Sequence, residues 1–427
     1  MKTLIKNGNI VTSQNELIPV DVWIEDGLIK GIGDFKEIEQ AFDEAYDACD
    51  GLITPGLVDV HVHFREPGFE YKETIETGSK SAARGGFTTV CAMPNLNPVP
   101  DTPEKLKTIY KKIKTDSVVN ILQYAPITKS LNSEELVDFK ELKDSGAFAF
   151  TNDGVGVQTA GVMYEAMREA AHLNMSIVAH TEDESLLFDG VMHEGKKSQE
   201  LGLPGIMSAT ESSQIARDVL LAQETGVHYH VCHVSTKESV EIIRQAKKHG
   251  ISVTCEVCPH HLILSEEDIT KDHGDFKMNP PLRATEDQQA LITGLLDGTI
   301  DCIATDHAPH SHEEKDQSML DSPFGITGSE TAFQLMFTHF VKTGRFTLSE
   351  IVYWMSEAPS KIFGLKTGTL NIGSPADIAI FNLEEKHMIT DNFLSKSKNT
   401  PFIGSEVYGD TMMTFVHGRK VWDKKEA

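Results

Sequence analysis

The sequence has few basic residues, and this deficit limits the partners that the protein can have. Its 427 residues include 39 Lys and Arg against 64 Asp and Glu, which gives a formal charge of −25. A surface of that sign repels nucleic acid and anionic lipid. We therefore expect neither nucleic acid nor a membrane as a partner.

Long apolar runs are also missing. No stretch approaches the roughly 20 apolar residues that a membrane span needs. The start, MKTLIKNGNIV, lacks the basic segment and long apolar core of a secretion signal. We expect a cytoplasmic protein.

Cysteine is scarce as well. Six cysteines in a chain of this length are too few for a disulfide scaffold. Cys255 and Cys258 have the spacing of a redox or zinc pair, but residues three apart on a strand point to opposite faces. We interpret the cysteines as buried thiols.

The two ends of the chain share one pattern. Short pieces that alternate apolar and polar residues, with Asn-Gly and Asp-Gly turns, occupy the start, as in Asp21–Gly27. The same alternation recurs in Ala376–Phe381 and Thr414–Trp422. We expect residues 1–53 and 366–427 to pair into one small β-sandwich domain.

Residues 54–365 have a different character, because apolar runs of strand length alternate there with helical stretches such as Val157–Asn174 and Glu211–Thr225. This alternation is typical of a parallel sheet built from βαβ units. Eight runs predict a (β/α)8 TIM barrel. They are Leu57–His63, Thr88–Met93, Val118–Pro126, Ala147–Asp153, Ser176–Glu182, His228–Ser235, Ser252–His261 and Cys302–His310.

Polar residues gather at the carboxyl ends of these runs. In such a barrel those ends form the active face, so the side chains there converge on one mouth. Unrelated structural residues would not favour one end, and the pattern therefore indicates an active site. The residues are His61, His63, Asn95, Asp153, His180, His233, His260, His261, Asp306 and His310.

Part of this set is a candidate metal site. His61 and His63 stand at i and i+2, on one face of a strand and close enough to bind one ion. Four imidazoles and two carboxylates without thiolate favour zinc over calcium or magnesium. We predict one or two Zn²⁺ ions in a catalytic site formed by His61, His63, Asp153, His180, His233 and Asp306.

Plainer interpretations exist for several of these residues. Asn152-Asp153-Gly154 is a turn sequence in its own right. His180 and His233 are also compatible with hydrogen-bonded core histidines. Their place at strand ends favours the metal site.

Several motifs together resemble the dihydroorotases of the amidohydrolase superfamily, and the resemblance covers essentially the whole chain. The His-x-His pair and the aspartate of the eighth run are shared with hydantoinases and allantoinases, whereas Phe-Arg-Glu-Pro-Gly and Met-Pro-Asn favour dihydroorotases. The motifs are Asp59–Gly68, Met93–Asn95, Pro259–Leu262, Asn279–Arg283 and Thr305–His310.

The resemblance implies a reaction and its substrate contacts. The reaction is the reversible hydrolysis of (S)-dihydroorotate to N-carbamoyl-L-aspartate in pyrimidine (UMP) biosynthesis. The groups that hold the substrate carboxylate would be Arg65, Asn95 and His310, with Asn279 as a further contact. Phe324 and Gly325, in the irregular segment 311–328, are candidates to bring backbone groups close to the ring, although an ordinary turn predicts the same sequence.

One feature of the resemblance concerns the fourth run. Many relatives bridge two metals there with a carbamylated lysine, but residues 147–158 contain no lysine and Asp153 stands in its place. This resembles the long bacterial dihydroorotases that use an aspartate. Thr151 and Asn152 differ from the Ser-Asp that is frequent in the family, which leaves the number of metals open.

The residues also suggest a mechanism. Metal binding lowers the pKa of water from near 15.7 to about 7, which makes it a nucleophile at neutral pH. Asp306 is the candidate general base and acid, which takes a proton from this water and passes it to the leaving amide nitrogen. Arg65 offers a planar fork to a carboxylate, although it also suits a surface ion pair with Glu66.

Two other functions stay open. One is a cyclic amidase of the hydantoinase or allantoinase kind. The other is a non-catalytic dihydroorotase-like subunit that structures a partner such as aspartate transcarbamoylase, although every expected ligand is present. We expect a homodimer, because two-fold dimers are the commonest soluble assemblies.

Overall fold

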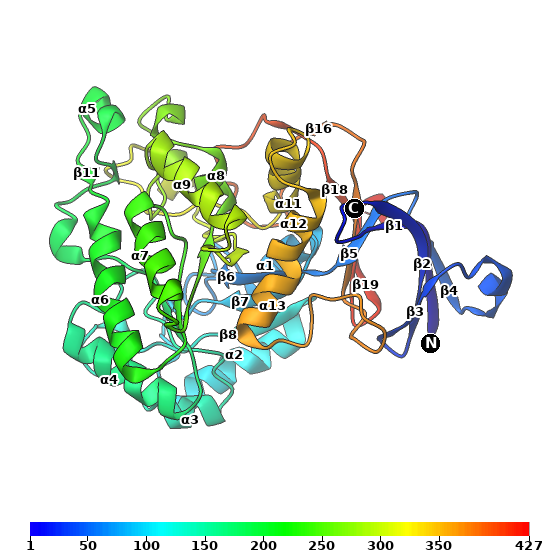
Figure 1. Cartoon of the computed structure of the whole chain (residues 1–427), viewed down its shortest axis with the longest axis horizontal. Coiled ribbons are helices and arrows are strands. Elements are labelled where there is room, and N and C mark those ends of the chain that lie inside the picture. Colours follow the sequence, from blue (N-terminus) through cyan, green and yellow to red (C-terminus); the bar gives the residue numbers. More distant parts are fainter. Residues whose placement is uncertain (427) are drawn as a thin grey trace.

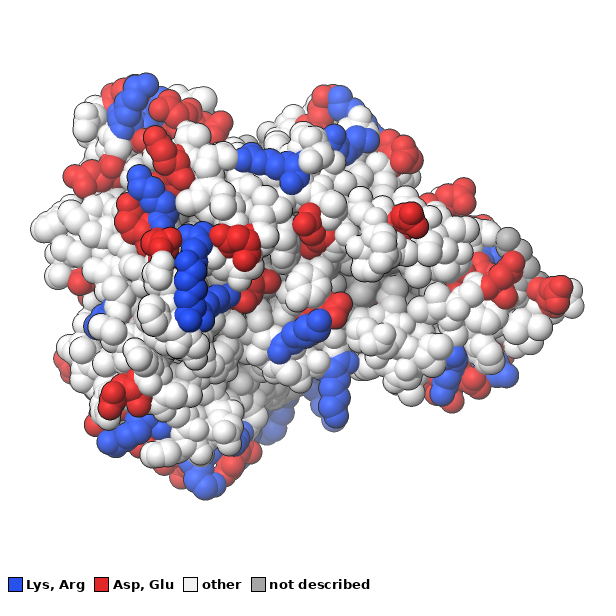
Figure 2. Space-filling model, viewed as in Figure 1, with Lys and Arg blue, Asp and Glu red and all other residues white. Residues whose placement is uncertain are grey.

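The computed structural model describes residues 1–426 and contains two joined bodies: a barrel surrounded by helices and a smaller sheet beside it (Figure 1). Both termini lie in the smaller sheet. Within the described residues, no helix is long and apolar enough to cross a membrane. Acidic and basic side chains are interspersed on the face shown in Figure 2.

The predicted barrel is confirmed. Its strands pair in parallel in two arcs, β6-β7-β8 and β9-β12-β13-β14. Single bridges close the ring: Phe150 joins Ala125 to Ile177, and His307 joins Val62. The strands are β6 (Leu57–Val62), β7 (Phe87–Ala92), β8 (Asn120–Gln123), β9 (Ile177–Ala179), β12 (Tyr229–Val231), β13 (Val253–Val257) and β14 (Cys302–Ile303).

The strands are shorter than the apolar runs that predict them, and the fourth run contributes only the bridges of Phe150. The apolar runs continue into the loops at the mouth because these loops are buried too, as Thr151 and Asp153 show. His260 and His261 lie on the short helix α8 (Pro259–Ile263) instead of at a strand end. Proline at the first turn favours the start of a helix there.

Helices cover the outside of the barrel, and several begin at a threonine whose hydroxyl accepts a backbone hydrogen bond, as Thr74, Thr159 and Thr236 do. The predicted helical stretches correspond to α4 and α6. The main helices are α1 (Ile75–Arg84), α2 (Pro103–Asp116), α3 (Phe139–Asp144), α4 (Ala160–His172), α6 (Ala209–Thr225), α7 (Lys237–Lys248), α9 (Thr285–Leu296), α11 (Ala332–Met336), α12 (Leu348–Val352) and α13 (Ala358–Phe363).

Shorter elements decorate the mouth. An excursion after β9 contains β10 (Met192–His193), α5 (Lys196–Leu201) and β11 (Gly205–Ile206), and α10 (His312–Lys315) follows the eighth strand. The excursion and the segment after α10 share one apolar cluster that includes Met192 and Met319. These loops are therefore packed together and form a wall of the mouth.

The two ends of the chain join in one sheet with the order β19-β18-β15-β5-β1-β2-β3, and β4 also pairs with β1. Side chains from opposite ends of this order, such as Val22 and Phe415, belong to one apolar cluster, so the sheet curls on itself. Its strands are β1 (Lys2–Val11), β2 (Leu17–Glu25), β3 (Leu28–Gly33), β4 (Glu44–Asp47), β5 (Leu52–Pro55), β15 (Ile378–Asn382), β18 (Asp410–Val416) and β19 (Arg419–Asp423).

The chain passes from this sheet to the barrel at Gly56, where a Cβ would lie 2.1 Å from Oγ1 of Thr88. Because only glycine allows so close an approach, we propose Gly56 as the boundary. Part of the range 366–427 lies on the barrel: Ile389 and Phe402 cluster with Leu335 of α11. Residues 383–409, between β15 and β18, form this returning segment. It contains β16 (His387–Met388) and β17 (Glu406–Val407), and it brings Ser395 and Asn399 towards the mouth.

Candidate active site and metal centre

A cavity of about 210 Å³ lies at the mouth of the barrel. All of the predicted metal ligands and substrate contacts line it except His61, which is fully buried beside Asp306. His260 and His261 do not line it. The lining residues are His63, Arg65, Asn95, Asp153, Gly154, His180, His233, Asn279, Asp306, Ala308, His310, Phe324 and Gly325.

One half of the cavity floor is formed by the His-x-His pair and the aspartate that follows β14. Nε2 of His63 lies 3.0 Å from Oδ1 of Asp306, and Nε2 of His61 lies 3.4 Å from the same oxygen. Donor atoms placed tetrahedrally at about 2.1 Å from one ion are roughly 3.4 Å apart. These three side chains have the spacing of ligands to one metal.

Asp153 joins this group to the second pair of histidines. Its Oδ1 lies 3.3 Å from Nε2 of His61 and 3.8 Å from both Nδ1 of His180 and Nε2 of His233. Its Oδ2 lies 3.4 Å from Nε2 of His63. One carboxylate therefore faces all four imidazoles, as a ligand shared between two ions would.

Unpaired donor atoms support the fit to a metal. Nε2 of His61 and Oδ1 of Asp153, 3.3 Å apart, are both buried without a hydrogen-bond partner. Buried polar atoms are rarely left in that state, because the loss of hydration is costly. The groups His61-His63-Asp306 and Asp153-His180-His233 each bring three donor atoms within 4.8 Å of one another.

Neighbouring side chains orient the first histidine pair. Nδ1 of His61 lies 2.6 Å from Oε1 of Glu256, and Nδ1 of His63 lies 2.9 Å from Oδ1 of Asn95. Each oxygen accepts the Nδ1 hydrogen, which leaves Nε2 free towards the candidate metal site. Burial opposes ionisation of Glu256, but the adjacent imidazole of His61, which donates to it, outweighs burial and lowers the pKa of Glu256 to about 2.

The same balance holds Asp306 ionised. Burial raises its pKa, but the neighbouring imidazoles, that of His61 above all, outweigh burial and lower the pKa below its usual value. The preceding residue, Thr305, donates its hydroxyl to Oδ2 of Asp59 at 2.5 Å, which fixes the chain next to the carboxylate. Asp306 has a φ of 49°, in the left-handed region, where backbone strain is often stored at functional sites.

Cationic and polar groups face the cavity opposite this floor. Arg65 is buried: its Nε donates to the carbonyl of Pro309 at 3.1 Å, and its Nη2 lies 3.2 Å from Nε2 of His310. The alternative of a surface ion pair with Glu66 is wrong, since Glu66 pairs with Lys112. The cavity thus has a floor of candidate metal ligands and a cationic wall.

The comparisons with known proteins agree with this geometry. A family model described as "Dihydro-orotase-like" matches residues 50–239. Over its full length the chain is 66% identical to the full length of a dihydroorotase of Enterococcus faecalis, and 59% identical to that of Ligilactobacillus salivarius. The chain belongs to the dihydroorotase family.

The fold extends beyond that family. The solved structure of an L-hydantoinase (dihydropyrimidinase) of Arthrobacter aurescens superposes on this chain with a TM-score of 0.88, and the two sequences are 28% identical. The match covers 99% of this chain and 96% of the other. The barrel and its side sheet are therefore common to cyclic amidohydrolases that act on different rings.

In this member of the dihydroorotase family, Asn279 contacts a residue that the sequence did not single out. Its amide donates to the carboxylate of Glu182, whose Oε2 also lies 3.8 Å from Nε2 of His180. Burial opposes ionisation of Glu182, but His180 outweighs it and lowers the pKa of Glu182. This carboxylate connects the predicted substrate contact to the second histidine pair.

The sequence also did not single out Asn399 of the returning segment. Its side-chain amide donates to the carbonyls of Ala308 and Gly325, at 3.2 and 3.0 Å, and its Oδ1 accepts from the backbone N–H of His310. The one side chain holds together three residues that line the cavity. No local motif marks it, because its contacts lie more than 70 residues away along the chain.

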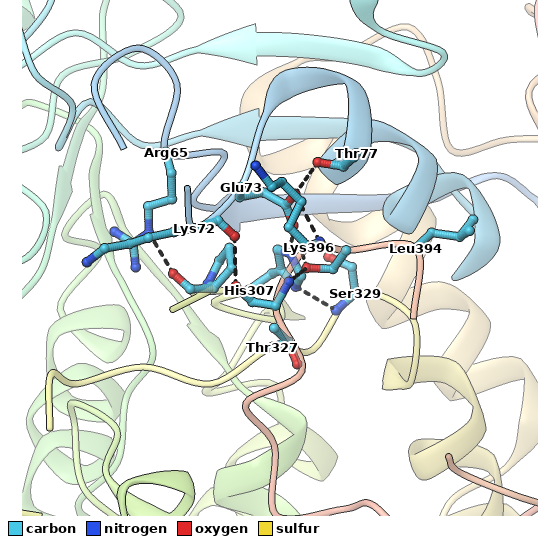
Figure 3. Close-up of polar contacts among 12 residues, drawn as sticks. Arg65, Lys72, Glu73, Thr77, His307, Thr327, Ser329, Leu394 and Lys396 are labelled. Carbon is cyan, nitrogen blue, oxygen red and sulfur yellow. Dashed lines mark hydrogen bonds and ion pairs between the residues drawn. The ribbon is translucent and has the colours of Figure 1, made fainter. Parts of the chain in front are cut away.

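A buried polar cluster lies behind the eighth strand and holds the returning segment in place (Figure 3). Glu73 accepts hydrogen bonds from the hydroxyls of Ser395 and Thr77. Nδ1 of His307 accepts the backbone N–H of Gly328 at 3.2 Å, so its hydrogen is on Nε2, 3.6 Å from Glu73. The residue next to Asp306 is thereby fixed to the C-terminal part of the chain.

Proposed function

We propose that this chain is a zinc-dependent dihydroorotase, which reversibly hydrolyses (S)-dihydroorotate to N-carbamoyl-L-aspartate in pyrimidine biosynthesis. The observation that carries the proposal is the shared cavity of Asp306 and Arg65. Dihydroorotate has a carboxylate at one end and a cyclic amide at the other. A cationic wall opposite a metal-binding floor matches that division.

Zinc is the proposed metal, with positions for two ions. Four imidazoles and two carboxylates suit it, and no thiolate belongs to the two groups. One ion would be held by His61, His63 and Asp306 and the other by His180 and His233, with Asp153 shared. Bound zinc would lower the pKa of water and polarise the ring carbonyl.

The cationic wall orients the substrate. Arg65 presents a planar guanidinium that matches a carboxylate with two parallel hydrogen bonds. Asn95 uses its Oδ1 on His63, which leaves its Nδ2 to donate. Gly154 makes room for this amide, because its ideal Cβ would lie 3.3 Å from Nδ2 of Asn95. Together with His310, these donors fix which carbonyl of the ring faces the floor.

Asp306 moves the proton. Its carboxylate is held ionised and buried beside His63, so it can accept a proton from the attacking water. It then delivers that proton to the amide nitrogen as the C–N bond breaks. In the reverse direction it takes a proton from the carbamoyl nitrogen as the ring closes.

The backbone at Gly325 completes the proposed ring site. Gly325 has a φ of 129°, and a Cβ there would lie 2.7 Å from the Cβ of Ala308. Its amide donates to the carbonyl of Lys277, and its own carbonyl is held by Asn399. Phe324 and Gly325 are thereby held against the cavity, as a backbone contact to the substrate ring requires.

The experiment is the hydrolysis of dihydroorotate by the zinc-supplemented protein, with hydantoin and allantoin as competing substrates. An Arg65→Ala variant is measured beside Arg168→Ala, an exposed arginine on α4. We expect selective turnover of dihydroorotate that is lost with Arg65→Ala and kept with Arg168→Ala. Activity on uncharged rings alone would favour a hydantoinase, and inactivity with bound metal would favour the non-catalytic subunit.

The assembly is a separate part of the proposal. A homodimer and an association with aspartate transcarbamoylase are both compatible with this function. The mass of the purified protein in solution, alone and with a transcarbamoylase added, tests them.

A further inference from the structure

An amine that the proposed chemistry does not use lies behind the cationic wall. Lys72 is in the loop between β6 and α1, and 12% of its side chain is exposed. Its Nζ lies 3.2 Å from Nδ1 of His310 and 2.9 Å from Oε1 of Glu314. Figure 3 shows its side chain extending to the same side as that of Arg65 and away from Thr77.

The contacts of His310 determine which of its nitrogens carries hydrogen. Nε2 lies 2.8 Å from the carbonyl oxygen of Phe324. A carbonyl only accepts, and this contact is shorter than the 3.2 Å between Nε2 and Nη2 of Arg65, which only donates, so the hydrogen is on Nε2. Burial and the charges of Arg65 and Lys72 lower the pKa of His310, so the ring is neutral and has only this one hydrogen. Nδ1 is then an acceptor, and the ammonium of Lys72 is its donor.

A competing partner makes this assignment depend on Lys72. Oε2 of Glu314 lies 3.4 Å from Nδ1 of His310 and also accepts the backbone N–H of Ser311. Without the lysine, this carboxylate would attract the imidazole hydrogen to Nδ1. Nε2 would then present a lone pair to the carbonyl of Phe324 and to the cavity.

We propose that Lys72 is a positioning residue for substrate binding: its ammonium donates to Nδ1 of His310 and thereby keeps the donor hydrogen on Nε2, beside Arg65. This inference rests on the proposed function, in which His310 holds the substrate carboxylate. With the hydrogen on Nε2, the carboxylate meets a donor that it shares with the carbonyl of Phe324. With the hydrogen on Nδ1, it meets a lone pair and is repelled, so Lys72 favours an anionic ring over an uncharged one.

Kinetics of zinc-loaded, full-length variants test the proposal. Lys72→Met removes the donor with little change of shape, and Lys72→Arg keeps a charged donor. Lys80→Met is the matched control, since Lys80 is an exposed lysine on α1 that pairs with Glu76. We expect Lys72→Met to raise KM for dihydroorotate about tenfold, as loss of a charge-assisted hydrogen bond does. We expect kcat to stay within about twofold, since only substrate binding is affected.

The second readout is the ¹⁵N spectrum of the histidine rings, assigned with a His310→Asn variant. We expect the hydrogen on Nε2 in the unmodified protein and in Lys72→Arg, and on Nδ1 in Lys72→Met. An unchanged tautomer in Lys72→Met would overturn the proposal, and so would an unchanged KM or a loss of kcat with lowered thermal stability. The spectrum needs no turnover, so it separates failure of this inference from failure of the proposed function.

Discussion

Glu256 accepts a hydrogen bond of 2.6 Å from Nδ1 of His61. Both side chains are fully buried in the barrel, and the second carboxylate oxygen of Glu256 contacts His230 at 3.1 Å. The arrangement fixes the ring of His61 with Nε2 towards Asp153 and Asp306. The candidate metal site is therefore oriented by side chains of the barrel interior.

Replacement of Glu256 tests this role. Glu256→Gln keeps the size of the side chain but removes the charge that supports the imidazole. Loss of such a partner lowers metal affinity by about 10- to 100-fold. We expect that decrease in a zinc competition assay with a chromophoric chelator. Asp301→Asn, on the barrel but paired with Lys247, serves as the control and should keep the original affinity.

The sharing of Asp153 predicts the metal content of variants. His180→Asn removes a ligand of one proposed ion only, whereas Asp153→Asn weakens both. We expect zinc content, measured on protein dialysed against dilute zinc, to fall further in Asp153→Asn than in His180→Asn. Equal loss of zinc in the two variants would show that Asp153 does not join two sites.

Much of this arrangement could be predicted from the sequence. The strand-end positions of His61, His180 and Asp306 follow from the alternation of apolar runs and helices, because parallel strands place their carboxyl ends at one mouth. The lengths of the strands could not be predicted. Thr151 and Asp153 are as buried as residues of the barrel strands, although only Phe150 of that run pairs with neighbouring strands. Hydrophobicity indicates which residues are buried, and burial continues beyond the last hydrogen bond between strands, so it does not show where a strand ends.

The supporting residues were not predicted, for a different reason. Glu256 lies inside an apolar run, and its role depends on His61, 195 residues away. Asn399 acts through carbonyl groups, which every residue has, so no residue pattern marks its partners. Five of the six cysteines are buried as expected, but Cys49 is exposed. Contacts between segments that are far apart in the sequence can be recognised only in the structure.

Asn399 should affect substrate binding. Asn399→Ala leaves the carbonyl of Ala308 without its donor and removes one of the two donors to the carbonyl of Gly325, and a buried unsatisfied group costs about 1–3 kcal/mol. We expect a lower midpoint of thermal unfolding and a raised KM for dihydroorotate. Asn392→Ala, an exposed asparagine of the same segment, should change neither. A normal KM in Asn399→Ala would mean that the segment only stabilises the fold.

Lys315 predicts a dependence of stability on pH. Its buried Nζ donates to the carbonyls of Lys277, Pro323 and Gly325, and burial lowers its pKa from 10.5 to about 7. Between these values the unfolded chain binds a proton that the folded chain does not, so a rise in pH stabilises the fold.

The matching variant is Lys315→Met, which cannot titrate. We expect the midpoint of thermal unfolding of the unmodified protein, relative to that of Lys315→Met, to rise from pH 7 to pH 9.5. Lys342→Met is the control, because Lys342 is a lysine outside the mouth that lies over the ring of Tyr408. A difference between Lys315→Met and the unmodified protein that stays constant with pH would mean that Lys315 keeps its proton in the fold.

We propose Asp306 as the general base and acid of a dihydroorotate-hydrolysing site. The most direct measurement is the rate of dihydroorotate hydrolysis by the zinc-loaded protein and by Asp306→Asn, with circular dichroism as the check on folding. We expect turnover by the unmodified protein and a loss of at least about 10²-fold in the variant, which is the lower limit of a general acid–base contribution, with the fold intact. Full activity in a folded Asp306→Asn protein would contradict it.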